Sequence, residues 1–276
     1  MSGFTSIDLS RLPAPQVIET LDFDILLAEM KAEAILQMPE LADALALESE
    51  AATKILRVCA YFRMLDRAEF NDGARANMLA LSTGSDLDQL GAYWAVERLI
   101  VQEANDTIIP PVELIMEADA DFRARIQLSL EGHTSAGPRG SYIYWALSAS
   151  GEVKDAAVDS PTPGAVVVTI LSRQGDGLAD PALLTAVEDA LNDDDIRPLT
   201  DFVTVNAATI LEYQVAATLT LYDGPDAQAV VEAAQDAVDA LVVNLHRLGH
   251  DITLSALSAA LHPPGVQQVP ITSPAA

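Results

Sequence analysis

The stretch Ala52-Thr-Lys-Ile-Leu-Arg-Val-Cys-Ala-Tyr-Phe-Arg-Met-Leu65 decides how the N-terminal third of the chain folds. Four of its apolar side chains recur at intervals of three and four residues, the spacing of a seam on a helix that packs against other helices. The seam consists of Ile55, Val58, Phe62 and Leu65. The pattern predicts one long helix from about Ser49 to Leu81, roughly 50 Å in length. A helix this long in a thin helical region favours a contact with partner helices; the alternative is that the seam lines the core of the single chain.

Shorter helices flank the long one. Residues Phe23–Leu36 have a helical pattern that ends before Pro39. Gly73 lies inside the long helix, where it costs about 1 kcal/mol relative to alanine, and is a candidate position for a bend. Thr83-Gly-Ser85 ends the long helix, and Ser85 is the expected N-cap of the next one. The further helices that the sequence predicts are Asp86–Ala95, Asp119–Leu130 and Ser141–Ser148.

At Gly151 the hydrophobic pattern changes from a helical period to one typical of strands. The run Ala165–Leu171 is almost continuously β-branched, as in a buried strand, and Asp180-Pro181 predicts the start of a helix. Residues 213–221 alternate between apolar and polar, which predicts a half-buried strand. The remaining predicted elements are strands at 153–158, 202–205 and 266–271 and helices at 226–248 and 253–261.

These patterns predict an α+β fold. A helical N-terminal third with a long bundle-forming helix precedes two small tandem α/β modules. We expect a helical region over residues 1–118, a helical connector over 119–150, a first α/β module over 151–209 and a second over 210–276.

Charge and cysteine content exclude several classes of partner. The 276 residues include 15 Lys and Arg against 41 Asp and Glu, a net charge of −26. So few cations argue against binding to nucleic-acid phosphates or to anionic membrane surfaces. The single cysteine, Cys59, permits no intramolecular disulfide, and its apolar neighbours predict a buried structural thiol. The sequence has no apparent secretory signal or membrane-spanning run, so we expect the chain to fold inside the cell.

The sequence contains no recognisable motif for catalysis, cofactor binding or metal binding. The nucleophile elbow and the glycine-rich phosphate loops are missing. The loop 137–141 is a candidate anion site, with a simple elbow and Ser141 as N-cap as the alternative. The carboxylates of 193–195 lack the ligand spacing of a calcium loop, and a helix-breaking glycine separates His246 from His250. The sequence therefore gives no positive evidence of an active site, and we expect no catalytic residues, no cofactor and no metal.

Four segments of the chain resemble a known family when taken together and in order. They are Leu12–Phe23, Ala52–Tyr61 with Asn71-Asp72, Gly84–Ala92 and Arg197–Val205. The chain resembles the baseplate J-like family, the baseplate assembly or wedge proteins of P2-type contractile-tailed phages and tailocins. The resemblance covers nearly the whole chain.

The resemblance implies a structural protein that is not an enzyme, located in the tail baseplate of a virion that is assembled in the cytoplasm of the bacterial host. Two copies would form a helical bundle with one copy of another wedge protein, and the seam at Ile55, Val58, Phe62 and Leu65 would be the partner interface. The C-terminal modules would meet neighbouring copies in a ring around the central hub, and the ring would widen when the sheath contracts. Two alternatives remain: an acidic cytosolic enzyme, or an adaptor that binds peptides at a sheet edge.

Overall fold

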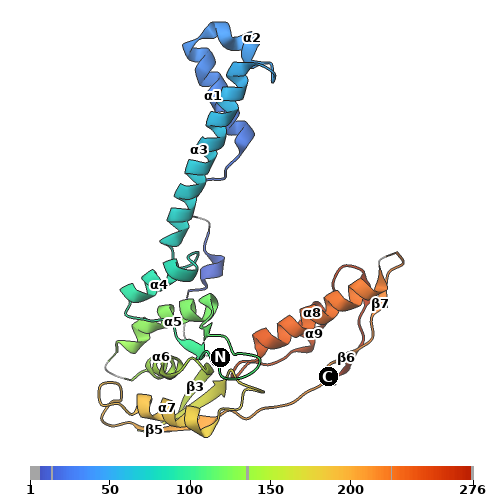
Figure 1. Ribbon diagram of the computed structural model, residues 1–276. Coiled ribbons are helices and arrows are strands. Elements are labelled where there is room, and N and C mark those ends of the chain that lie inside the picture. The colour runs from blue at the N-terminus through green and yellow to red at the C-terminus, as the bar shows by residue number, and fades with distance from the viewer. Residues whose placement is uncertain (1–6, 14, 135–136, 225, 275–276) are drawn as a thin grey trace. The chain divides into compact units, whose positions relative to one another are not determined.

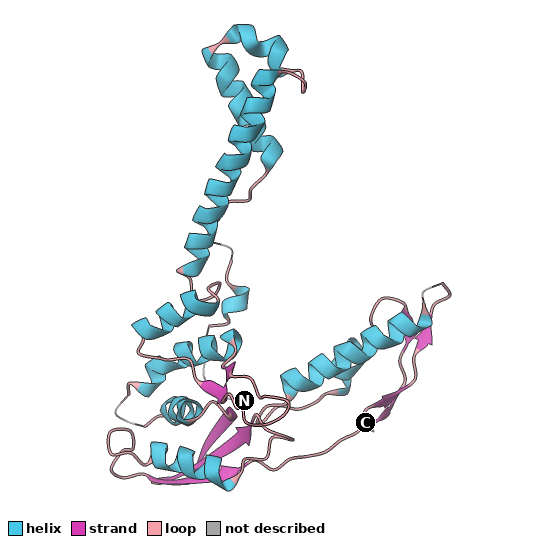
Figure 2. Cartoon of the chain, viewed as in Figure 1, coloured by secondary structure: helices cyan, strands magenta, loops and turns pink. Residues whose placement is uncertain are grey.

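The computed structural model describes residues 7–13, 15–134, 137–224 and 226–274 (Figure 1). The chain divides into a helical unit, residues 6–97, and a mixed unit that contains residues 98–276. In the described residues, the helical unit contains helices and no strands, and all the strands belong to the mixed unit (Figure 2). The expected fold class, a helical N-terminal part followed by sheet-containing modules, is confirmed.

The helical unit is built around a pair of packed helices. Helix α1 begins after Asp22, whose carboxylate accepts a hydrogen bond from the backbone N–H of Asp24 at 2.8 Å. Leu26 and Leu27 of α1 are buried together with Ala60 of α3. The helices of this unit are α1 (Phe23–Gln37), α2 (Ala42–Leu45), α3 (Ala51–Ala76) and α4 (Gly84–Tyr93), with short 3-10 turns at Leu9–Arg11 and Pro39–Leu41.

One side chain on the second half of α3 holds the segment that precedes α1. Asn71 is only 3% exposed. Its Nδ2 donates to the backbone carbonyl of Glu19 at 2.9 Å, and its Oδ1 accepts from the backbone N–H of Glu19 at 3.0 Å. Arg67 adds an ion pair to the Glu19 carboxylate at 3.0 Å. The face of α3 that holds α1 therefore also holds the chain leading into α1.

Two details of the predicted helices were wrong. Helix α3 ends at Ala76 rather than at Leu81, so its 26 residues span about 39 Å. It continues through Gly73, because the helix ladder tolerates a single glycine at a modest cost. Helix α4 has Thr83 rather than Ser85 as its N-cap, and the backbone turns there through Gly84 with a φ of +54°.

The mixed unit contains a three-stranded sheet in the order β3-β4-β5. Strands β3 (Val153–Thr162) and β4 (Ala165–Ser172) are antiparallel, and β4 is parallel to β5 (Phe202–Ala207). Helix α7 (Pro181–Leu191) makes the crossover between the parallel strands; the Asp180 carboxylate caps it by accepting from Leu183 N–H at 2.7 Å. Helices α5 (Asp119–Gly132) and α6 (Arg139–Ala149) precede the sheet.

The sheet and its helices enclose the largest apolar core of the described residues. Helices α6 and α7 both contribute side chains that are fully or nearly fully buried. The most deeply buried members are Ala146, Val168, Ile170, Val187 and Leu191.

A two-stranded hairpin, which the sequence analysis did not predict, precedes α5. It consists of β1 (Ile100–Gln102) and β2 (Ile115–Met116). Glu117 anchors its base: its backbone N–H donates to Leu99 O at 2.8 Å, and its carboxylate accepts from Leu99 N–H at 3.2 Å. The same carboxylate pairs with Arg125 at 2.6 Å, and both side chains are at most 5% exposed. A Cβ at Gly151 would collide with the carbonyl oxygen of Ile100, so the hairpin also requires a glycine at that position.

The C-terminal module, residues 213–273, has helices α8 (Ala227–Leu245) and α9 (Leu254–Ala260) and two small sheets. Strand β6 (Ala216–Ala217) pairs with β9 (Ile271–Ser273), and β7 (Thr220–Leu221) pairs with β8 (Val266–Gln268), both antiparallel. The prediction of continuous strands at 213–221 and 266–271 was wrong. Pro270 lies between β8 and β9 and has no N–H to donate, so it interrupts the ladder. Helix α8 also ends three residues before the predicted Leu248.

Candidate interaction surfaces

The predicted seam of α3 is exposed in the single chain. The exposed fractions of its side chains are 63% for Ile55, 56% for Val58, 58% for Phe62 and 38% for Leu65. The alternative that these residues line the core of the single chain is therefore wrong.

The seam lies on the side of α3 that faces away from α1. The α3 residues that are buried or packed toward α1 and its leading segment include Thr53, Ala60 and Asn71. Ile55 comes two residues after Thr53, and Phe62 comes two residues after Ala60. Two residues correspond to a rotation of about 200° around the helix axis, so the seam residues point away from the buried ones. Helix α3 thus carries apolar side chains on two opposite faces, of which one is covered within the chain.

Aromatic and sulfur-containing side chains extend this exposed surface. The rings of Tyr61 and Phe62 make an edge-to-face contact with centroids 5.7 Å apart. Cys59 is also exposed, so the expectation of a buried structural thiol was wrong. Ile55 and Phe62, one helical turn before and after it, belong to the exposed surface rather than to the core, a difference that helical spacing does not reveal.

In the candidate anion loop at 137–141, the one cationic side chain, Arg139, is already paired with a carboxylate of the protein. A pocket of about 240 Å³ beside it is lined by Arg139, Asp159 and Asp201, among others. Arg139 pairs with Asp159 at 3.0 Å, and the Tyr142 hydroxyl donates to Asp201 at 2.7 Å. Burial raises the pKa of Tyr142, and the hydrogen bond and negative charge of Asp201 raise it further. Two carboxylates in the pocket disfavour an anion.

Ser141 lies buried inside α6, whose N-cap is Pro138, so the prediction of Ser141 as the cap was wrong. The carboxylates at 193–195 form a turn after α7, in which Asp193 accepts from the backbone N–H of Asp195 at 2.8 Å. Among the residues that the structure describes, no three His, Cys, Asp or Glu side chains are grouped so as to hold a metal ion.

His246 takes part in a junction between the C-terminal module and the sheet. Its Nδ1 lies 2.9 Å from the Lys154 ammonium on β3, and the Asp155 carboxylate accepts from the backbone N–H of Leu248 at 2.9 Å. Burial lowers the pKa of Lys154, and the nearby positive charges of Arg173 and Arg247 lower it further. These contacts connect the end of α8 to β3.

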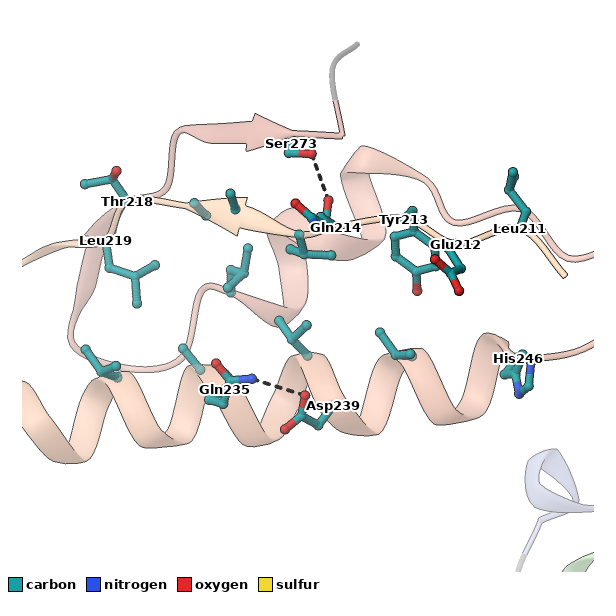
Figure 3. A pocket seen from close by; sticks show the side chains of 18 residues that line it. Leu211, Glu212, Tyr213, Gln214, Thr218, Leu219, Gln235, Asp239, His246 and Ser273 are labelled. Atoms are coloured by element: carbon teal, nitrogen blue, oxygen red, sulfur yellow. Dashed lines mark hydrogen bonds between the residues drawn. The ribbon is translucent and has the colours of Figure 1, made fainter. Parts of the chain in front are cut away.

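An open groove lies between α8 and residues 211–219 (Figure 3). Its volume is about 1350 Å³. Leu219 points toward α8 from one side, and Gln235 and Asp239 project from the helix on the other. Gln235 donates to the Asp239 carboxylate at 3.2 Å. The apolar lining includes Val215, Leu219, Val231, Val238, Val242 and Leu261.

The sequence carries little signal for this α8 groove. Alternation in residues 213–221 indicates a half-buried segment. Whether a groove opens beside that segment depends on the distance to α8, which no local pattern determines.

A helical unit with an exposed apolar seam, followed by sheet-containing modules, is typical of a structural assembly protein that acts through its surfaces. Models of the baseplate J-like family match the chain in three places: the N-terminal domain at residues 48–105, the central domain at 134–207 and the C-terminal domain at 213–276. The chain belongs to the baseplate J-like family. It is 46% identical over 275 residues to baseplate protein J of Escherichia phage P2, a match that covers 98% of this chain and 91% of that protein.

Family membership makes the chain a structural component of a phage tail baseplate, located in the virion. The helices in the described part of the chain include none that is both long and apolar enough to cross a membrane.

Proposed function

We propose that this protein is a wedge subunit of a contractile tail baseplate, in a phage or a tailocin, and that it has no catalytic activity. Its N-terminal helices bundle with those of another wedge protein through Ile55, Val58, Phe62 and Leu65. Its C-terminal module meets neighbouring copies to close a ring around the hub. Widening of that ring relays the trigger for sheath contraction.

The observation that carries the bundling proposal is the exposed seam opposite α1. Burying a large apolar side chain completely contributes about 1.5–3 kcal/mol. The seam has four such side chains, of which the most exposed is Ile55 at 63%. Covering them with partner helices would therefore stabilise a complex by several kcal/mol, a gain that the single chain leaves unused.

Charge supports an assembly with other chains. A net charge of −26 discourages copies of the free protein from associating through their apolar surfaces. The ring contact is proposed for residues 210–276. The division of the chain into four regions, with boundaries after residues 118, 150 and 209, stays a prediction.

The bundle is tested by co-expressing the chain with the products of its flanking genes and measuring the native mass of the purified complex. We expect two copies of this chain with one copy of a neighbour. If the chain were purified as a monomer that binds none of the co-expressed proteins, the wedge assignment would be contradicted.

A matched pair of variants tests the role of the seam. Phe62→Ser removes a seam residue that is 58% exposed, whereas Phe70→Ser removes a ring that is 62% exposed on the same helix. Eight residues separate the two, so Phe70 is rotated by about 80° from Phe62. We expect Phe62→Ser to reduce the yield of complex at least tenfold and Phe70→Ser to leave it nearly unchanged. Equal losses would show that the seam is not the interface.

A further inference from the structure

We propose that the α8 groove is a docking site for an extended segment of a different baseplate chain, in which apolar residues alternate with Lys or Arg. The groove is separate from the α3 seam and forms one part of residues 210–276, the region for which the ring contact is proposed. Three properties of the groove point to this partner: its apolar lining, its free strand edge and its charge.

The size and lining of the groove fit a stretch of polypeptide. Small-molecule sites usually measure about 300–1,000 Å³, whereas this groove measures about 1350 Å³ and is open to solvent. Val231 and Val238 of α8 and Leu219 of the facing segment line it. Val231 is 45% exposed, whereas Val238, two turns further along the same face of α8, is only 7% exposed. The lining therefore combines a buried floor with an apolar wall that the chain itself leaves uncovered.

The strand side of the groove offers backbone pairing. In the described part of the chain, β6 has one neighbouring strand, β9. The side-chain hydroxyls of Thr272 and Ser273 also bind residues 214–216 from that same side, at 3.0 and 2.9 Å. The opposite edge of residues 211–219 has no strand beside it among the described elements. An extended peptide adds to such an edge through main-chain hydrogen bonds, and its alternate side chains enter the groove.

Charge selects a cationic partner. The charged side chains that line the groove include Glu212 and Asp239, and no Lys or Arg among the described residues lines it. Residues 198–276 contain eight Asp and Glu but a single Arg, Arg247, and no Lys. A second such module would meet like charges in this groove, which costs binding energy. A partner with Lys or Arg on the solvent side of its strand gains complementary contacts with the rim.

The exposed hairpin of another copy fits poorly for the same reason. Residues 100–116 form the short hairpin β1–β2 and include exposed apolar side chains, with Ile109 at 98% exposure. They carry Glu103, Asp106 and Glu113 and no Lys or Arg. The groove therefore favours a chain of different composition over a second copy of this one.

The test uses the full chain and fluorescently labelled ten-residue peptides, with binding measured by fluorescence anisotropy. A peptide alternating Val and Lys should bind at least tenfold more tightly than one alternating Val and Glu. A peptide alternating Ser and Lys carries the same charge without apolar side chains and should bind about as weakly as the Val and Glu peptide. Higher salt should weaken the binding of the Val and Lys peptide, since the charged contacts at the rim of the groove are exposed to solvent. N-methylation of alternate residues on the edge-facing side should abolish its binding.

Two matched pairs of variants locate the site. Val231→Asn in the groove should weaken binding about three- to tenfold, whereas Val243→Asn, on an exposed valine of the same helix outside the lining, should not. Asp239→Asn should weaken it about two- to fivefold at low salt, and Asp236→Asn, an exposed acid outside the lining, should not.

Either of two results would overturn the proposal. One is equal binding of the Ser and Lys peptide, or equal effects within the pairs, because the interaction would then be a general attraction between charges. The other is a dimer of the free chain in which residues 211–219 are protected from hydrogen exchange, because the occupant would then be a second copy. Both results are independent of whether the α3 seam forms a bundle.

Discussion

Helix α3 and strand β4 are both rich in apolar side chains, but the chain buries them to opposite degrees. On β4, Val168 and Ile170 are completely buried, whereas on α3 the seam residues Ile55 and Phe62 are more than half exposed. Strand β4 has a strand on each side and helices α6 and α7 in its core, while α3 has α1 on one face. Apolar content is therefore a poor guide to burial. The neighbours that a chain supplies determine whether an apolar face belongs to a core or to an interface.

The largest loss of stability in the free chain is expected from a substitution in the buried ion pair next to the hairpin β1–β2. Arg125→Met removes the guanidinium that pairs with Glu117 at 2.6 Å, with both side chains at most 5% exposed. A buried carboxylate left without its partner typically costs about 3–5 kcal/mol. We expect a loss of that size in the unfolding free energy of the mixed unit, measured by hydrogen exchange of peptides from β3 and β4.

A double variant separates the pair from the packing. Glu117→Met combined with Arg125→Met removes both charges and should recover much of the loss, because no unpaired carboxylate then stays buried. If the double variant were less stable than Arg125→Met, the carboxylate would stabilise this site mainly through its hydrogen bond from Leu99 N–H at 3.2 Å.

A core truncation on β4 should have the next largest effect. Ile170→Ala removes a fully buried side chain from a closed core, which typically costs about 2–5 kcal/mol. Chemical denaturation monitored by hydrogen exchange should show the loss in the mixed unit and no change in peptides from α3. A loss below about 1 kcal/mol would mean that the core around β4 is less closely packed than its burial indicates.

Elements with strong local signals could be predicted from the sequence. Asp22 and Asp180 precede helices α1 and α7, and both carboxylates accept the backbone N–H bonds expected of N-caps. The β-branched run 165–171 became the central strand β4. Each of these signals depends on residues close together in the sequence, so tertiary contacts have little to change.

Features that depend on distant residues could not be predicted in this way. The hairpin β1–β2 has only three and two residues in its strands, and its base depends on Glu117 and Arg125. The break between β8 and β9 differs from these features, because the missing N–H of Pro270 is a local signal in the sequence. The position of the seam followed from spacing, whereas its exposure, and that of Cys59, depends on the position of α1.

The smallest effect on the free chain is expected at the seam, and this gives the most direct test of the comparison. Ile55→Ala removes the same atoms as Ile170→Ala, but from a side chain that is 63% exposed. Surface substitutions usually change the unfolding free energy by no more than about 0.5 kcal/mol, and alanine also favours the helix. We expect the unfolding free energy of α3 in the free chain, measured by hydrogen exchange, to change by no more than that.

In the complex with the flanking-gene product, the same substitution should lower the stability of the complex by about 1 kcal/mol or more, because the Ile55 side chain is then buried. A loss of more than about 2 kcal/mol in the free chain would contradict the comparison, since Ile55 would then be stabilising the single chain like a core residue. If the stability of the complex did not change, the seam of α3 would be exposed in the complex as well, and the reason for assigning it to a bundle would be removed.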